Sequence, residues 1–176
     1  MKNKNRISVR ENYQKLGVEK FYENIGENYE NFHLHQVKYL IEKNLSFLNK
    51  ENRILDLCAG TGEASLILFE NGFNNICGCD PYLYKIYEIN CKKKCFPYSF
   101  KNILEGKLTQ NFDVIICSFG LHLCPEKQIK SLLSIFKYYL GIKKIIIISP
   151  NKKPLIEGLI YQEEYKRVKF KVYLLE

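Results

Sequence analysis

One segment, Arg53 to Glu63 (RILDLCAGTGE), restricts the folds open to this chain more than any other part of it. Its first half, 54–57, is an apolar run broken only by Asp56, which predicts a buried parallel strand. Gly60 and Gly62 then permit a sharp turn and a close approach of the backbone to a ligand, because they lack a Cβ atom. Apolar residues return at helical spacing after Glu63. A strand, a glycine turn and a helix in this order are typical of a nucleotide site.

A second acidic residue, Asp80, ends the next apolar run, 75–79. A carboxylate at the carboxyl end of the neighbouring strand can accept hydrogen bonds from the hydroxyls of a ribose. A dinucleotide-dependent oxidoreductase would need Gly-x-Gly-x-x-Gly, and Ser65 stands where its third Gly belongs, so that class is disfavoured. The glycine turn could also be an ordinary loop of an α/β protein. This alternative is disfavoured because the strand, the turn and the spaced acidic residue all indicate a nucleotide site.

These segments resemble motif I and the acidic loop of class I S-adenosylmethionine (SAM)-dependent methyltransferases, and the likeness extends over nearly all of residues 50–176. The resemblance implies a small, single-domain enzyme that takes a methyl group from SAM and releases S-adenosylhomocysteine (SAH). Cys58 stands where the family most often has its first Gly, a replacement by another compact residue.

The resemblance also assigns a cofactor site. The backbone of the glycine turn would face the methionine part of SAM, and Asp80 would bind the ribose. Asn102 would accept a hydrogen bond from the adenine amino group. That Asn102 is a loop residue without a role is an equal alternative. The residues expected to bind the cofactor are Asp56, Cys58, Ala59, Gly60, Gly62, Asp80, Pro81, Tyr82, Asn102, Ile103, Ser118 and Phe119.

Catalysis by such an enzyme depends mainly on the alignment of the acceptor atom with the methyl carbon and sulfur of SAM, because the sulfonium already activates the methyl group. His122 follows the predicted fourth strand and is the candidate for a catalytic role, with a loop His of no chemical function as the alternative. An amino-terminal segment could form a lid on the acceptor side. Its candidates are Tyr13, Tyr22, Tyr29 and His33, and each of the three tyrosines could instead pack between helices.

Alternating strand and helix patterns predict an α/β fold with a doubly wound, mostly parallel, seven-stranded Rossmann-like sheet. A C-terminal antiparallel hairpin and N-terminal helices complete it. Expected strands are 53–58, 75–80, 97–101, 112–118 and 144–149, with a hairpin over 155–174; expected helices are two within 9–25, then 33–48, 63–70, 83–93 and 125–139. We expect one domain, 1–176, with a helical lid segment at 1–49 and a sheet core at 50–176.

The charge of +8 suggests an anionic partner such as RNA, but the lysines are scattered, which favours a solvated surface. The acceptor is a small molecule, a protein or RNA, with nucleic acid not favoured, and the oligomeric state stays open. A second functional hypothesis is a methyltransferase-fold protein that acts as a non-catalytic partner or regulatory subunit.

Seven cysteines without paired Cys-x-x-Cys knuckles favour reduced, buried thiols and no metal site. The longest apolar run, 145–148, is far below the roughly 20 residues of a membrane span. The amino terminus lacks the pattern of a secretory signal, so we expect a cytoplasmic or nuclear address.

Overall fold

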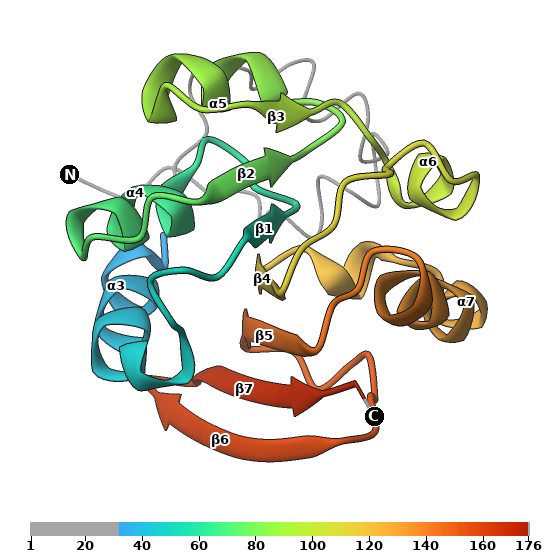
Figure 1. Cartoon of the computed structure of the whole chain (residues 1–176). Coiled ribbons are helices and arrows are strands. Elements are labelled where there is room, and N and C mark those ends of the chain that lie inside the picture. Colours follow the sequence, from blue (N-terminus) through green and yellow to red (C-terminus); the bar gives the residue numbers. More distant parts are fainter. Residues whose placement is uncertain (1–31, 176) are drawn as a thin grey trace, which may run out of the picture. The chain divides into compact units, whose positions relative to one another are not determined.

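The computed structural model describes residues 32–175, and these contain a seven-stranded sheet with the strand order β3-β2-β1-β4-β5-β7-β6 (Figure 1). The first five strands in this order are parallel, and β7 pairs antiparallel with both β5 and β6. The strands are β1 (Ile54–Leu57), β2 (Ile76–Cys79), β3 (Cys95–Phe96), β4 (Val114–Ser118), β5 (Lys144–Ser149), β6 (Leu159–Tyr165) and β7 (Val168–Leu174). The predicted doubly wound sheet with a terminal antiparallel hairpin is confirmed.

Helices cover both faces of this sheet. In Figure 1, α3 and α4 lie on one side and α6 and α7 on the other. The helices are α3 (Leu34–Lys43), α4 (Glu63–Glu70), α5 (Tyr84–Cys91), α6 (Phe100–Leu104) and α7 (Glu126–Tyr138), with 3₁₀ turns η2 (Leu45–Phe47) and η3 (Leu121–Leu123). Within the described part of the chain, β5 runs to β6 through 150–158 without a helix, and no helix is long and apolar enough to cross a membrane.

The run of four isoleucines in β5 is explained by two hydrophobic cores. Ile145 and Ile147 join the core beneath α6 and α7, whereas Ile146 and Ile148 join the core beneath α3 and α4. Because successive side chains of a strand point to opposite faces, a strand covered on both sides is apolar at every position.

Two predicted boundaries are wrong. The helix expected over 33–48 ends at Lys43, where the Asn44 side chain donates from Nδ2 to the Leu40 carbonyl at 2.9 Å and a 3₁₀ turn follows. The strand expected at 97–101 lies earlier, at Cys95–Phe96, and Phe100 begins α6. Ser99 and Asn102 form a capping box there, in which each side chain accepts from the backbone N–H of the other. This local pairing starts a helix where apolar content alone suggests a strand.

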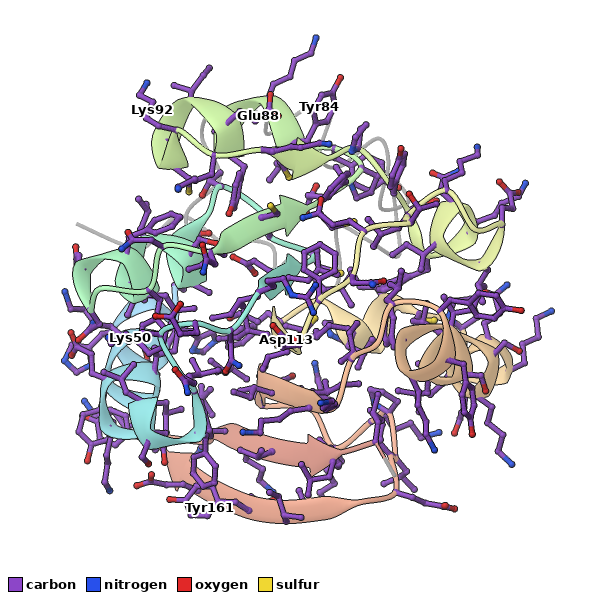
Figure 2. All side chains as sticks on the ribbon, viewed as in Figure 1. Lys50, Tyr84, Glu88, Lys92, Asp113 and Tyr161 are labelled. Carbon is purple, nitrogen blue, oxygen red and sulfur yellow. The ribbon has the colours of Figure 1, made fainter. Side chains whose placement is uncertain are left out.

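The amino ends of β1 and β4 are joined by an ion pair. The Arg53 guanidinium donates to both carboxylate oxygens of Asp113 at 2.8 and 3.1 Å, and the Arg53 backbone N–H donates to one of them at 2.8 Å. Arg53 holds the pKa of Asp113 at about 2. Figure 2 labels Asp113 beside β4 and Tyr161 on the edge strand β6. Asp113 is therefore part of the framework at the amino edge.

The side chains of α7 that pack against the sheet should contribute strongly to the free energy of unfolding. Phe136 is fully buried in it, whereas Tyr138, two residues on, is 71% exposed. We expect Phe136→Ala to lower the free energy of unfolding by about 3–5 kcal/mol, because it leaves a cavity. The control Tyr138→Ala should stay within about 0.5 kcal/mol of the wild type. Urea denaturation measures both, and equal losses would contradict the assigned packing of α7.

Candidate functional site

The loop after β1 makes a tight turn from three residues in the left-handed conformation. Cys58, Gly60 and Gly62 have φ values of 57°, 56° and 98°. The Gly62 N–H donates to the Ala59 carbonyl at 2.9 Å, and the Gly62 carbonyl accepts the first helical bond of α4, from Leu66. Cys58 adopts a conformation that side chains with a Cβ rarely take, which accounts for the usual Gly at that position in the family.

Asp80 ties this loop to the turn after β2. Its Oδ2 accepts from the Gly60 N–H at 3.0 Å, and its Oδ1 accepts from the N–H groups of Tyr82 and Leu83 at 2.9 and 2.8 Å. Burial raises the pKa of Asp80, and the three backbone hydrogen bonds oppose that rise. Because a carboxylate oxygen has two lone pairs, Oδ2 can accept a further hydrogen bond beside the one from Gly60. Pro81 and Tyr82 belong to the turn that this carboxylate caps.

Beneath the loop lies a buried chain of three polar side chains. Ser65, on α4, donates from Oγ to Asp56 Oδ2 at 2.7 Å, and its Oγ lies 2.8 Å from the Tyr87 hydroxyl. Because the one Ser65 hydroxyl proton goes to Asp56, the Tyr87 phenol is the donor to Ser65. Burial raises the pKa of Tyr87. Burial also raises the pKa of Asp56 to about 8, although the Ser65 hydrogen bond opposes the rise. Asp56 is thus linked to the start of α4, the helix that follows the loop.

Tyr87 also packs against Gly62 and Gly78, a role that the sequence alone did not reveal. A Cβ on Gly62 would lie 2.3 Å from Cys91 Sγ and 3.1 Å from the Tyr87 ring, and one on Gly78 would lie 2.8 Å from the same ring. Only residues without a side chain let the backbone approach this ring so closely. In the sequence, Tyr87 looks like any aromatic residue on the buried face of a helix.

The end of β4 approaches the same loop. A Cβ on Gly120 would lie 2.1 Å from Cys58 Cβ and 2.6 Å from its Sγ, so only Gly fits there. A hydrogen bond with Cys117, together with burial, raises the pKa of Cys58 well above that of a free thiol, so the thiol keeps its proton. Gly120 was missed, because nothing in the sequence connects it with Cys58.

Ser118 and Phe119 stand at this carboxyl end of β4, as predicted. Phe119 has φ 57° and donates its N–H to the Ile148 carbonyl at 2.9 Å. Its ring stacks on His33, with the ring centroids 5.0 Å apart and the planes 10° apart. His33 therefore lies next to the end of β4, whereas Tyr13, Tyr22 and Tyr29 fall outside the described residues.

The other predicted residues lie on helices around this edge. Asn102 is in α6, where its Oδ1 accepts from Ser99 N–H at 3.1 Å and from Ser99 Oγ at 3.0 Å. Ile103 is fully buried in the core beneath α6, and exposed His122 lies in η3. The capping box engages the carbonyl oxygen of Asn102 that was expected to meet adenine. A role for Asn102 and Ile103 in cofactor binding stays a prediction.

The loops that follow β1, β2 and β4 lie next to one another. Asp80 hydrogen-bonds Gly60, and Gly120 touches Cys58. In open α/β sheets, ligands bind outside the carboxyl ends of the strands, at the point where the strand order reverses. That point lies between β1 and β4 in this sheet.

Comparisons with known proteins agree with this geometry. The solved structures similar to the chain include magnesium protoporphyrin IX methyltransferase from Synechocystis PCC 6803 with bound SAM, at 13% identity and a TM-score of 0.64 over 98% of this chain and 99% of that one. The ribosomal protein L11 methylase of Lactobacillus delbrueckii subsp. bulgaricus is similar at 15% identity and a TM-score of 0.59, over 82% and 79% of the two chains. At such identities these likenesses show the fold.

Sequence comparison supplies the family. An uncharacterized protein of Schizosaccharomyces pombe is 24% identical over 190 aligned residues, which cover 84% of this chain and 76% of that protein. Residues 32–143 match the sequence model of a family described as a methyltransferase domain, and this stretch is more than half of the chain. The chain therefore belongs to the methyltransferase domain family, whose methyl donor is SAM.

Proposed function

We propose that this protein transfers a methyl group from SAM to a small-molecule acceptor. The observation that carries the proposal is Asp80, which is buried, tied to the loop after β1 through Gly60, and still able to accept a ribose hydroxyl at Oδ2. Gly60 and Gly62 bring the backbone close enough to the methionine part of the cofactor. The hydrogen bond between Ser65 and Asp56 joins the end of β1 to the helix that follows the loop.

When bound, SAM supplies an activated methyl group, so the residues of the chain have to position the acceptor and exclude water. Ser118, Phe119 and His33 lie beside the end of β4, where an acceptor would meet the donor. His122 follows on η3 and is proposed to take a proton from an acceptor that carries one at working pH. Tyr13, Tyr22 and Tyr29 remain candidates for a cover over the acceptor.

Two observations favour a small acceptor and a working enzyme. The described core has no helix between β5 and β6 and no inserted substrate domain, and the lysines of the sequence are scattered. Asp56, Gly60, Gly62 and Asp80 are all present, whereas the alternative, a non-catalytic partner subunit, does not require them to be kept. The two named solved structures act on unlike substrates, a porphyrin and a ribosomal protein, so they do not select an acceptor.

The first prediction concerns cofactor binding. Titration calorimetry should show one SAH bound per chain, and at about 100 times the Kd the ligand should stabilise folding by roughly 2.7 kcal/mol. Asp80→Asn should weaken binding at least tenfold, because an amide has one accepting oxygen where the carboxylate has two. Asp113→Asn, at the amino edge, is the matched control and should bind SAH like the wild type. Absence of heat and of any melting shift at millimolar SAH would refute the proposal.

The second prediction concerns the protonation of Asp56. Its folded-state pKa of about 8 lies above the ordinary value of 3.8, so the folded chain holds a proton that the unfolded chain releases between these values. The free energy of unfolding should fall as pH rises from about 4 to 8, by at most about 1.4 kcal/mol per pH unit for this one proton. Asp56→Asn should lose this part of the pH dependence. Urea denaturation at pH 5, 6, 7 and 8 measures it, and parallel curves for the two proteins would show that Asp56 does not titrate in this window.

The third prediction separates His122 from the cofactor. His122→Ala should leave SAH affinity within a factor of two or so but lower methyl transfer by about 10² to 10⁴ if the imidazole acts as a base. The measurement is the transfer of labelled methyl from SAM into a low-molecular-weight cell extract, beside SAH calorimetry on the same sample. A loss of SAH affinity in step with activity would place His122 in the cofactor site or in the core.

A further inference from the structure

Within residues 32–175, two buried side-chain oxygen atoms have no hydrogen-bond partner. They are Oγ of Ser118, the last residue of β4, and Oε1 of Gln36, in the first turn of α3. A buried polar atom without a partner carries a desolvation penalty, so native proteins seldom keep one without a reason. Two such atoms on neighbouring elements indicate a site that a ligand completes.

Both residues belong to the region where the start of α3 packs near the end of β4. Gln36 follows His33 by three positions, so both side chains lie on one face of the helix. The same face carries the buried Val37 and Leu40. His33 stacks on Phe119, the residue directly after Ser118, at a centroid distance of 5.0 Å. The start of α3 therefore lies against the end of β4.

The chemistry of these groups defines the ligand they would accept. An amide oxygen can only accept a hydrogen bond, and a hydroxyl can either donate or accept. A ligand that satisfies Gln36 must therefore present an N–H or O–H group. Phe119 and His33 stack face to face and are both partly exposed, so a planar ring can extend this stack on its outer face.

We infer that Gln36 and Ser118 select the methyl acceptor, and that the acceptor is a small aromatic molecule with an amine or hydroxyl group on its ring. The inference rests on the proposed function, since it places the acceptor beside a SAM site at the same edge. Gln36 and Ser118 hold the N–H or O–H group of the ring while Phe119 and His33 support its plane. Gln36 and Ser118 determine which acceptor binds. The methyl transfer itself depends on the alignment of that acceptor with the methyl group of SAM.

The test uses the full chain saturated with SAH and two probes of similar shape, aniline and toluene. Aniline carries N–H donors and toluene has none, so aniline should bind at least tenfold more tightly by NMR titration, with shift changes at Gln36, Ser118 and Phe119. Gln36→Met and Ser118→Ala should remove that preference and leave the affinity for toluene unchanged. Equal binding of both probes, or an undiminished preference in both variants, would overturn the inference.

A second measurement separates a ligand role from a structural one. If the two oxygens have no partner in the free protein, Gln36→Met and Ser118→Ala should leave the melting temperature unchanged or raise it. A clear fall in melting temperature for both variants would mean that the oxygens serve the fold, and the inference would fail. SAH calorimetry on the wild-type protein distinguishes the two proposals. Without SAH binding the proposed function itself fails, whereas normal SAH binding with indifference to aniline refutes only the acceptor assignment.

Discussion

The candidate site depends on the carboxylate of Asp80. It is buried at the end of β2 and accepts backbone hydrogen bonds from Gly60 on one side and from Tyr82 and Leu83 on the other. A buried carboxylate is tolerated only when it is well hydrogen-bonded, and backbone N–H groups provide this without a counter-ion. The interaction fixes the loop after β1 relative to the turn after β2, so the two halves of the proposed cofactor site are held together by the fold itself.

The loop in turn depends on close packing beneath it. Cys91 and Tyr87 leave no room for a Cβ at Gly62, and Tyr87 leaves none at Gly78. The Tyr87 phenol is linked to Asp56 through Ser65. Where a Gly is usual in the family, the chain has Cys58, and Gly120 from the neighbouring strand leaves room for it. One departure from the family pattern is thus matched by a glycine more than sixty residues away in the sequence.

Much of the framework was predictable because it rests on local patterns. The expected limits of α4 and β5 agree with the structure, since a glycine turn and a continuous isoleucine run define them. The strand expected at 97–101 failed, because the Ser99–Asn102 capping box outweighs apolar content there. The roles of Tyr87, Gly120 and Gln36 could not be predicted, since each depends on contacts between segments far apart in the chain. The assignments of Asn102, Ile103 and His122 stay predictions.

The central claim is that Asp80 serves both the loop and the cofactor through one carboxylate. A crystal structure of the protein with SAH tests it most directly. We expect a ribose hydroxyl to lie within about 2.5–3.0 Å of Asp80 Oδ2 while the Gly60 N–H stays bonded to the same oxygen. SAH bound elsewhere on the molecule, or a ribose held by another group while Asp80 keeps only its backbone partners, would contradict the claim.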